Sequence, residues 1–316
     1  MLWVLSMGVS AKAGLSALLL LLPLGLEGQA LPRFTGGSSL VVLSATALDK
    51  HGRPVTNLRQ DEFRITEDGK PQPLQHFSQG VTAPARVLFL VDASGSMSAD
   101  LKATSTRMAL VQLLRALAPE DEAALAAFDH RYWGVVAFTK DRQAIETAYS
   151  EIEPFSSTAL HDALDHAASD LASHGEGRRA VVVITDGVDT ASQAKAEDVI
   201  ARSQALDVPI YAVTVLSPLD DPKSDRFVGK DHPPGPGASG AEVLERYATL
   251  SGGAAFVVSE FGALQRAAQT ITGELKQQYR LGYDPPSGPR RFRRIQVTTT
   301  RKGVVVKTRG GYLPSS

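Results

Sequence analysis

Residues 87–97 read VLFLVDASGSM, an apolar run followed directly by a carboxylate and two hydroxyl side chains. Five consecutive apolar residues are typical of a buried strand, and the small residues after them allow a tight turn. Asp92, Ser94 and Ser96 alternate along this turn, so their oxygen atoms can converge beyond the strand end. Mg²⁺ prefers about six oxygen ligands of this kind. An ordinary strand-to-helix turn with a capping side chain fits the same pattern, so both interpretations stay open for this stretch alone.

Two later stretches add further oxygen-bearing side chains. Residues 180–187 read AVVVITDG, a second buried strand that ends in Asp186 and a glycine turn. Residues 155–164 read FSSTALHDAL, which places Thr158 in a loop at the start of a helix. Parallel strands direct their carboxyl ends to the same edge of a sheet, where ligands of open α/β sheets bind. We therefore expect Asp92 and Asp186 to lie at one edge.

The order and spacing of these stretches resemble the von Willebrand factor A domain and its metal-ion-dependent adhesion site. In that family the first motif is Asp-x-Ser-x-Ser, followed by a loop Thr and a strand-end Asp. The resemblance implies a metal site made of the matching residues of this chain, Asp92, Ser94, Ser96, Thr158 and Asp186. It also implies a divalent cation, Mg²⁺ first and Mn²⁺ or Ca²⁺ as alternatives, whose shell is completed by an Asp or Glu of a partner protein.

The flanking sequence resembles the bacterial exported "VWFA-related" proteins. The similar pieces are DKHGRPV at 49–55, DEF at 61–63, EDGK at 67–70, QYRLGY at 278–283 and RGGY at 309–312. The resemblance therefore covers roughly residues 38–313. It implies an exported von Willebrand A domain and says little about the biological process.

Strand and helix patterns alternate over residues 85–277, which predicts an α/β fold with a doubly wound, mostly parallel sheet and helices on both faces. The short turn at 129–132 predicts that the second and third strands form an antiparallel hairpin. The family resemblance implies that the third strand then lies at the sheet edge. The expected strands are 87–91, 123–128, 135–138, 181–184, 210–215 and 255–258. The expected helices are about 100–117, 141–151, 159–173, 193–206, 241–250 and 261–277.

Two β segments flank this domain, at 38–80 and 278–313, and neither has enough apolar residues to fold alone. We expect them to pack together as one small β-sandwich; two separate appendages are the alternative. Asp68-Gly69 predicts a hairpin between strands 63–66 and 74–77. Loop 217–240 should start on the metal-binding edge, and Asp220, Asp221 or Asp225 of that loop are candidate internal ligands, with solvent exposure as the alternative.

The composition excludes several classes of protein. The chain of 316 residues has 33 Lys and Arg, 34 Asp and Glu and a net charge of −1, which argues against a nucleic-acid partner. It has no cysteine, so a disulfide framework, a thiolate nucleophile and Cys-ligated zinc are impossible. The basic cluster at 290–294 is interpreted as a solvated strand edge.

Residues 1–30 have the pattern of a signal peptide, with Lys12 ahead of an apolar run at 15–26 and small residues Gly28 and Ala30 before the cleavage point. The run is short for a membrane span, which needs about 20 residues. We therefore expect a periplasmic or secreted protein without a transmembrane span in its mature chain. An uncleaved N-terminal anchor is the alternative.

Three functions are compatible with these residues. We expect a non-enzymatic, metal-dependent binding module, with a metal-dependent hydrolase and a domain whose cation only staples loops as alternatives. Asp189 is a candidate base for the hydrolase, although a helix cap or an outer ligand is the simpler role. Asp162 and His166 have helix spacing for a surface pair, which we favour over zinc binding together with His161.

We predict that the mature protein begins at Leu31, because Gly28 and Ala30 occupy the positions that a signal peptidase reads. N-terminal sequencing of protein recovered from the envelope or medium measures this directly. A cytoplasmic protein that still begins at Met1 would contradict it.

Overall fold

The computed structural model describes residues 40–79, 84–98, 100–175, 177–215, 240–258 and 261–314. The expected signal peptide at 1–30 and the loop residues 217–239, with Asp220, Asp221 and Asp225, lie outside the described residues. Among the described residues, no helix is long and apolar enough to cross a membrane.

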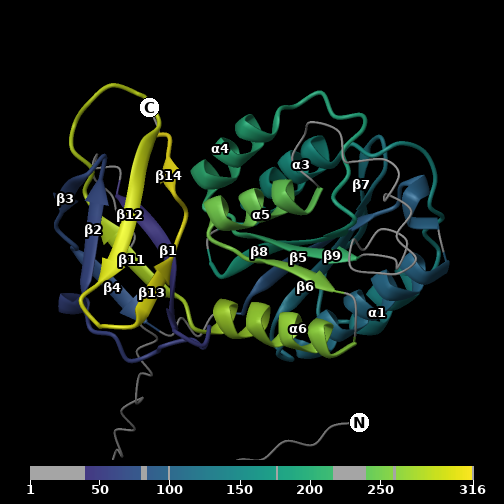
Figure 1. Cartoon of the computed structure of the whole chain (residues 1–316), viewed down its shortest axis with the longest axis horizontal. Helices are drawn as coiled ribbons and strands as arrows, with labels where there is room; N and C mark the ends of the chain where they lie inside the picture. The colour runs from purple at the N-terminus through teal and green to yellow at the C-terminus, as the bar shows by residue number, and fades with distance from the viewer. Residues whose placement is uncertain are drawn as a thin grey trace, which may run out of the picture. The chain divides into compact units, whose positions relative to one another are not determined.

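A six-stranded sheet forms the centre of the fold, in the order β10-β9-β8-β5-β6-β7 (Figure 1). Five of its strands are parallel, and β7 pairs antiparallel with β6 at the edge, as the short turn predicted. The strands are β5 (Arg86–Asp92), β6 (Glu122–Phe128), β7 (Tyr132–Thr139), β8 (Arg179–Thr185), β9 (Ile210–Val215) and β10 (Ala255–Val258). The predicted doubly wound α/β class is confirmed.

Helices cover both faces of this sheet because the apolar side chains of its strands alternate between them. Val87, Phe89 and Val91 face α1 and α6, whereas Leu88 and Leu90 face α3, α4 and α5. The helices are α1 (Asp100–Ala116), α2 (Arg142–Tyr149), α3 (Leu160–Ser173), α4 (Ala196–Leu206), α5 (Gly240–Ser251) and α6 (Phe261–Lys276).

The two ends of the described chain combine into a pair of four-stranded antiparallel sheets, ordered β13-β1-β11-β4 and β14-β12-β2-β3. Their facing side chains, including Leu43, Phe63 and Tyr279, share one buried core, so the expected sandwich forms and the separate appendages do not. The strands are β1 (Val41–Asp49), β2 (Phe63–Glu67), β3 (Lys70–Gln72), β4 (His76–Gln79), β11 (Tyr279–Tyr283), β12 (Arg293–Thr299), β13 (Val304–Lys307) and β14 (Gly311–Tyr312).

The predicted hairpin partner of residues 63–66 was wrong. Across the Asp68-Gly69 turn, β2 pairs with β3, not with the segment 74–77. Strand β4 joins the other sheet instead, where it pairs with β11. Pro71 and Pro73 flank Gln72, and proline weakens a strand signal although an edge strand tolerates it. This is why the sequence pattern concealed β3.

A buried carboxylate links the two sheets of the sandwich. Glu67 Oε2 accepts hydrogen bonds from the hydroxyls of Tyr283, at 2.7 Å, and Tyr312, at 3.0 Å. Its Oε1 accepts from Arg293 Nη1 at 2.9 Å. Tyr283 belongs to one sheet and the other three residues to the second, so one charge satisfies polar groups from both.

We predict that Glu67→Ala destabilises the protein by about 3–5 kcal/mol, because it leaves the buried Arg293 guanidinium without its charge partner. Asp61→Ala is the matched control. Asp61 pairs with Arg59 on the surface, where both side chains are more than two-thirds exposed, so its removal should leave stability close to that of the wild type. Urea unfolding measures both changes, and equal values would refute the role of Glu67.

Candidate metal centre

The parallel pairing of β5 with β8 brings Asp92 and Asp186 to the same edge of the sheet. Val91 lies opposite Ile184, so Asp92 continues the register opposite Thr185. The Thr185 hydroxyl donates to Asp92 Oδ2 at 2.5 Å. Asp186 follows one residue later, immediately beyond the end of β8.

The turn after β5 gathers the two serine hydroxyls. Asp92 Oδ1 accepts a hydrogen bond from the backbone N–H of Ser94 at 2.9 Å, which folds the chain back over the strand end. A short 3₁₀ helix, η2 (Gly95–Ser98), follows, and its Met97 is buried as an anchor. The hydroxyl oxygens of Ser94 and Ser96 lie 3.1 Å apart, with Ser94 buried and Ser96 exposed.

The loop that carries Thr158 is held between the other two strand-end loops. On one side, Phe155 N–H donates to Ala93 O at 2.8 Å, and Gly95 N–H donates to Ser156 O at 2.9 Å. On the other side, Thr158 O accepts from the backbone N–H of Thr190 at 2.8 Å. The structure therefore places the predicted residues Asp92, Ser94, Ser96, Thr158 and Asp186 on three interlinked loops at one edge.

The surroundings of Asp92 fit a cation. The hydrogen-bond partners that the structure gives its carboxylate, Thr185 Oγ1 and Ser94 N, are neutral. Burial, with a smaller contribution from the charge of Asp186, raises the pKa of Asp92 to about 6, although the hydrogen bonds from Thr185 and Ser94 lower it. A buried ionised carboxylate is costly unless a positive charge compensates it.

The serine hydroxyls also have a suitable separation. Neighbouring oxygens of an octahedral Mg²⁺ shell with bonds of 2.0–2.1 Å lie about 3.0 Å apart. The 3.1 Å between Ser94 Oγ and Ser96 Oγ matches this edge length. Neutral hydroxyls beside two carboxylates are hard oxygen donors, so the residues present suit Mg²⁺ or Mn²⁺.

Sequence reasoning missed one charged residue of this site. The ammonium of Lys102, in the first turn of α1, donates to Asp186 Oδ2 at 2.9 Å. Both side chains are buried, with 8% and 6% of their surface exposed. Lys102 lies ten residues beyond Asp92 in a helix whose pattern is otherwise ordinary, so the sequence held no signal that its side chain returns to this edge.

The turn after Asp186 is closely packed. Gly187 has a φ of +85°, and a Cβ there would lie 2.8 Å from the backbone of Gly240 at the start of α5. Only glycine therefore fits at position 187. The contact places the beginning of α5 against the turn that carries Asp186.

The other polar candidates have structural partners. Asp189 Oδ1 accepts from Ser192 Oγ at 2.6 Å and from His161 N at 3.3 Å, close to the start of α3. The expected pair of Asp162 with His166 was wrong: Asp162 accepts from the backbone N–H of Ala194 at 2.8 Å, and His166 stacks on Tyr132. Among the described residues there is no group of three or more His, Cys, Asp or Glu that could hold a metal, which disfavours the zinc interpretation.

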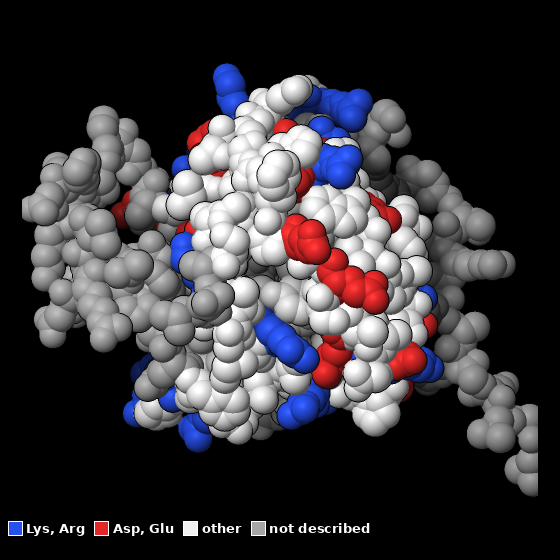
Figure 2. Space-filling view, turned by 90° about the vertical axis from the view of Figure 1, so that its right-hand side faces the viewer, with Lys and Arg blue, Asp and Glu red and all other residues white. Residues whose placement is uncertain are grey.

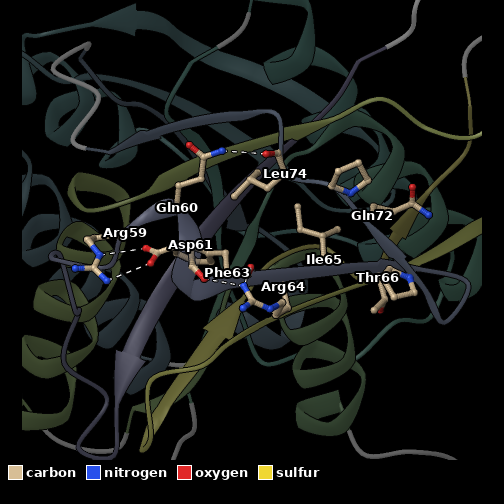
Figure 3. A pocket seen from close by; sticks show the side chains of 11 residues that line it. Arg59, Gln60, Asp61, Phe63, Arg64, Ile65, Thr66, Gln72 and Leu74 are labelled. Atoms are coloured by element: carbon tan, nitrogen blue, oxygen red, sulfur yellow. Dashed lines mark hydrogen bonds and ion pairs between the residues drawn. The ribbon is translucent and has the colours of Figure 1, made fainter.

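Two exposed apolar side chains lie on the loops of the site. Phe155 is 76% exposed, three residues before Thr158, and Val188 is 49% exposed, two residues after Asp186. A separate groove of about 670 Å³ lies on the sandwich beside β2 and β3, where Arg59 pairs with Asp61 (Figure 3). It contains none of the candidate metal ligands.

The molecular face in Figure 2 carries charges of both signs, with acidic side chains near its middle and Lys and Arg above and below them. Nucleic-acid binding favours a continuous basic surface instead. The described part of this face therefore carries no continuous basic surface.

We predict that Asp92→Asn stabilises the chelator-treated protein at pH 7.5 by up to about 3 kcal/mol, because it removes a buried charge. Since the pKa of Asp92 in the folded protein, about 6, exceeds 3.8, its contribution to stability is full below about pH 3.8 and is lost as the pH rises through 6. Asp186→Asn is the comparison: it removes the buried carboxylate charge that pairs with Lys102 and should destabilise. Thermal melts between pH 4 and 7.5 compare the melting temperatures of both variants with that of the wild type. An Asp92→Asn protein that is less stable than the wild type at pH 7.5 would contradict the prediction.

Comparisons with known proteins agree with this fold. Residues 87–188 match the family described as von Willebrand factor type A domain. No curated protein matches the chain significantly. BatB from Bacteroides thetaiotaomicron is similar at 18% identity and a TM-score of 0.47, over 61% of this chain and 99% of that one.

Two further structures show the same kind of similarity. A von Willebrand factor type A protein from Catenulispora acidiphila has 11% identity and a TM-score of 0.49, over 89% of this chain and 75% of that one. The PilB minor pilin from Streptococcus sanguinis has 14% identity and a TM-score of 0.41, over 66% of this chain and 63% of that one. The matching segment, the sheet order and the two-sided helical cover lead to one conclusion: residues 87–188 of this chain lie in a von Willebrand factor type A domain.

Proposed function

We propose that the chain is an exported, divalent-cation-dependent protein-binding module. Asp92, Ser94, Ser96, Thr158 and Asp186 would hold the cation, and a partner protein would supply an Asp or Glu to it. One observation carries the proposal: a buried carboxylate with neutral partners adjoins two hydroxyl oxygens that are 3.1 Å apart. When bound, the cation supplies a positive charge with a coordination position for an incoming carboxylate.

The protein's own residues determine why an acidic partner is suited to this site. Ser94, Ser96 and Thr158 offer neutral oxygens, so three of the five donors do not reduce the charge of the cation. The exposed hydroxyl of Ser96 marks the side on which a partner can approach. Phe155 and Val188 provide apolar contact next to this polar centre, an arrangement that suits a protein interface.

A binding role is supported over hydrolysis by the bonding of Asp189. A base must reach the proton that it removes. The Asp189 carboxylate instead holds Ser192 and the first turn of α3. We therefore propose no catalytic residue. A cation that only staples the three loops is the remaining alternative, and the two measurements below separate it from binding.

We predict that Asp92→Ala and Ser96→Ala each lower Mg²⁺ and Mn²⁺ affinity by at least about 10- to 100-fold, because each removes an oxygen donor from a shell of about six. Ser98→Ala is the matched control, since Ser98 lies on the same 3₁₀ turn and its hydroxyl donates to Gly95 O. Calorimetric titration of the full chain measures all three variants. Unchanged metal affinity in Asp92→Ala would show that the site is misassigned.

We further predict that acetate, as a minimal carboxylate, reduces the water-proton relaxation enhancement of Mn²⁺ bound to the wild type, because it replaces a water on the cation. Thr158→Ala should weaken this acetate effect more than it lowers the melting temperature. If acetate leaves the relaxation enhancement of the bound Mn²⁺ unchanged, the cation serves as a staple and the binding proposal fails.

A further inference from the structure

Lys102 places a buried positive charge in the candidate metal site. Its ammonium lies 2.9 Å from Asp186 Oδ2, and 92% or more of each side chain is removed from solvent. The surface ion pair of Arg86 with Glu122 leaves 30% or more of each side chain exposed, so solvent screens it far more. Lys102 therefore holds a positive charge next to the carboxylate of Asp186, which would also bind the cation.

This arrangement alters the charge of the site in both of its states. Asp92 and Asp186 are each negative when ionised, and Lys102 is positive, so the set without a divalent cation has a net charge of −1. Adding a divalent cation brings the set to +1. One carboxylate from outside would then neutralise it. Without Lys102, the same two carboxylates would neutralise the cation completely and leave no net charge for an acidic partner.

We propose, on the basis of the function above, that Lys102 couples cation binding to carboxylate binding. Its charge opposes the cation when the cation binds alone, and favours an incoming carboxylate once the cation is present. Each ligand then strengthens the binding of the other by the same factor, as thermodynamic linkage requires. The pair of Lys102 with Asp186 makes this a module that holds its cation weakly until an acidic partner arrives.

The geometry explains why Lys102 and not another residue has this role. Alternation along β8 directs Asp186 toward the face of the sheet that α1 covers, since Val182 and Ile184 pack in that core. Asp92 and Thr185 lie on the other face of the sheet, where the Thr185 hydroxyl donates to Asp92. A long side chain from the first turn of α1 thus reaches Asp186, whereas Asp92 bonds neutral groups.

The test measures the Mn²⁺ affinity of the full chain with and without acetate, by calorimetry and by Mn²⁺ electron paramagnetic resonance. For the wild type, we expect acetate to tighten Mn²⁺ binding by about 5- to 150-fold, the usual range of coupling between sites. Lys102→Gln keeps a hydrogen-bond donor for Asp186 but loses the charge. It should raise Mn²⁺ affinity without acetate by about 10-fold or more, because it removes a positive charge that repels the cation, and bring the acetate effect close to onefold.

Two control variants isolate the charge at this position. Lys102→Arg keeps the charge and should show the wild-type acetate effect. Lys140→Gln removes a positive charge beside Arg86 and Glu122, at the opposite edge of the sheet, and should behave as the wild type. An increase in Mn²⁺ affinity of equal size in Lys140→Gln would overturn the proposal, because it would reflect net charge alone.

The outcomes separate this proposal from the function on which it rests. If Mn²⁺ binds and acetate displaces its water, but Lys102→Gln leaves Mn²⁺ affinity and the acetate effect unchanged, the coupling proposal fails and the function stands. If neither protein binds Mn²⁺, the function itself fails. If Lys102→Gln does not fold, the wild type alone tests the coupling. A wild-type Mn²⁺ affinity that does not rise with acetate overturns the coupling proposal.

Discussion

The parallel pairing of β5 with β8 is the constraint on which the geometry of the candidate metal centre depends. It fixes Asp92 opposite Thr185 and sets Asp186 one residue further along the neighbouring strand. Because side chains alternate between the faces of a sheet, the two carboxylates are directed to opposite sides of the same edge. A shift of the register by one residue would exchange those sides and break the bond between Thr185 and Asp92.

This division gives the two carboxylates different electrostatic surroundings. Asp92 is buried, and it accepts hydrogen bonds from neutral donors. The burial raises its pKa and makes its ionised form costly. Asp186 is paired with the buried ammonium of Lys102. One acidic residue therefore stores unfavourable free energy that a cation can relieve, whereas the other is already compensated. Such destabilised groups are typical of functional sites, where stability is lost in favour of binding.

The sequence predicted the parts of this fold whose signals are local. Buried strands such as 210–215 and helices such as 160–173 have long apolar patterns, and the Asp-x-Ser-x-Ser turn has a fixed spacing. It could not reveal β3, because Pro71 and Pro73 interrupt the pattern and only the pairing with β2 makes it a strand. Lys102 and Asp162 show the same limit, since their partners Asp186 and Ala194 are distant in sequence and the contacts depend on the packing of helices on the sheet.

The β-sandwich is hydrogen-bonded to the α/β domain on the side away from the candidate metal centre. Tyr211, at the start of β9, donates to Glu274 of α6, which in turn accepts from Lys307 of β13 at 2.8 Å. Arg309 donates to Gln204 O at the end of α4. Tyr211 lies at the amino end of its strand, whereas Asp92 and Asp186 stand at the carboxyl ends of theirs. The terminal segments therefore contact the α/β domain away from the end of the sheet that carries the candidate metal ligands.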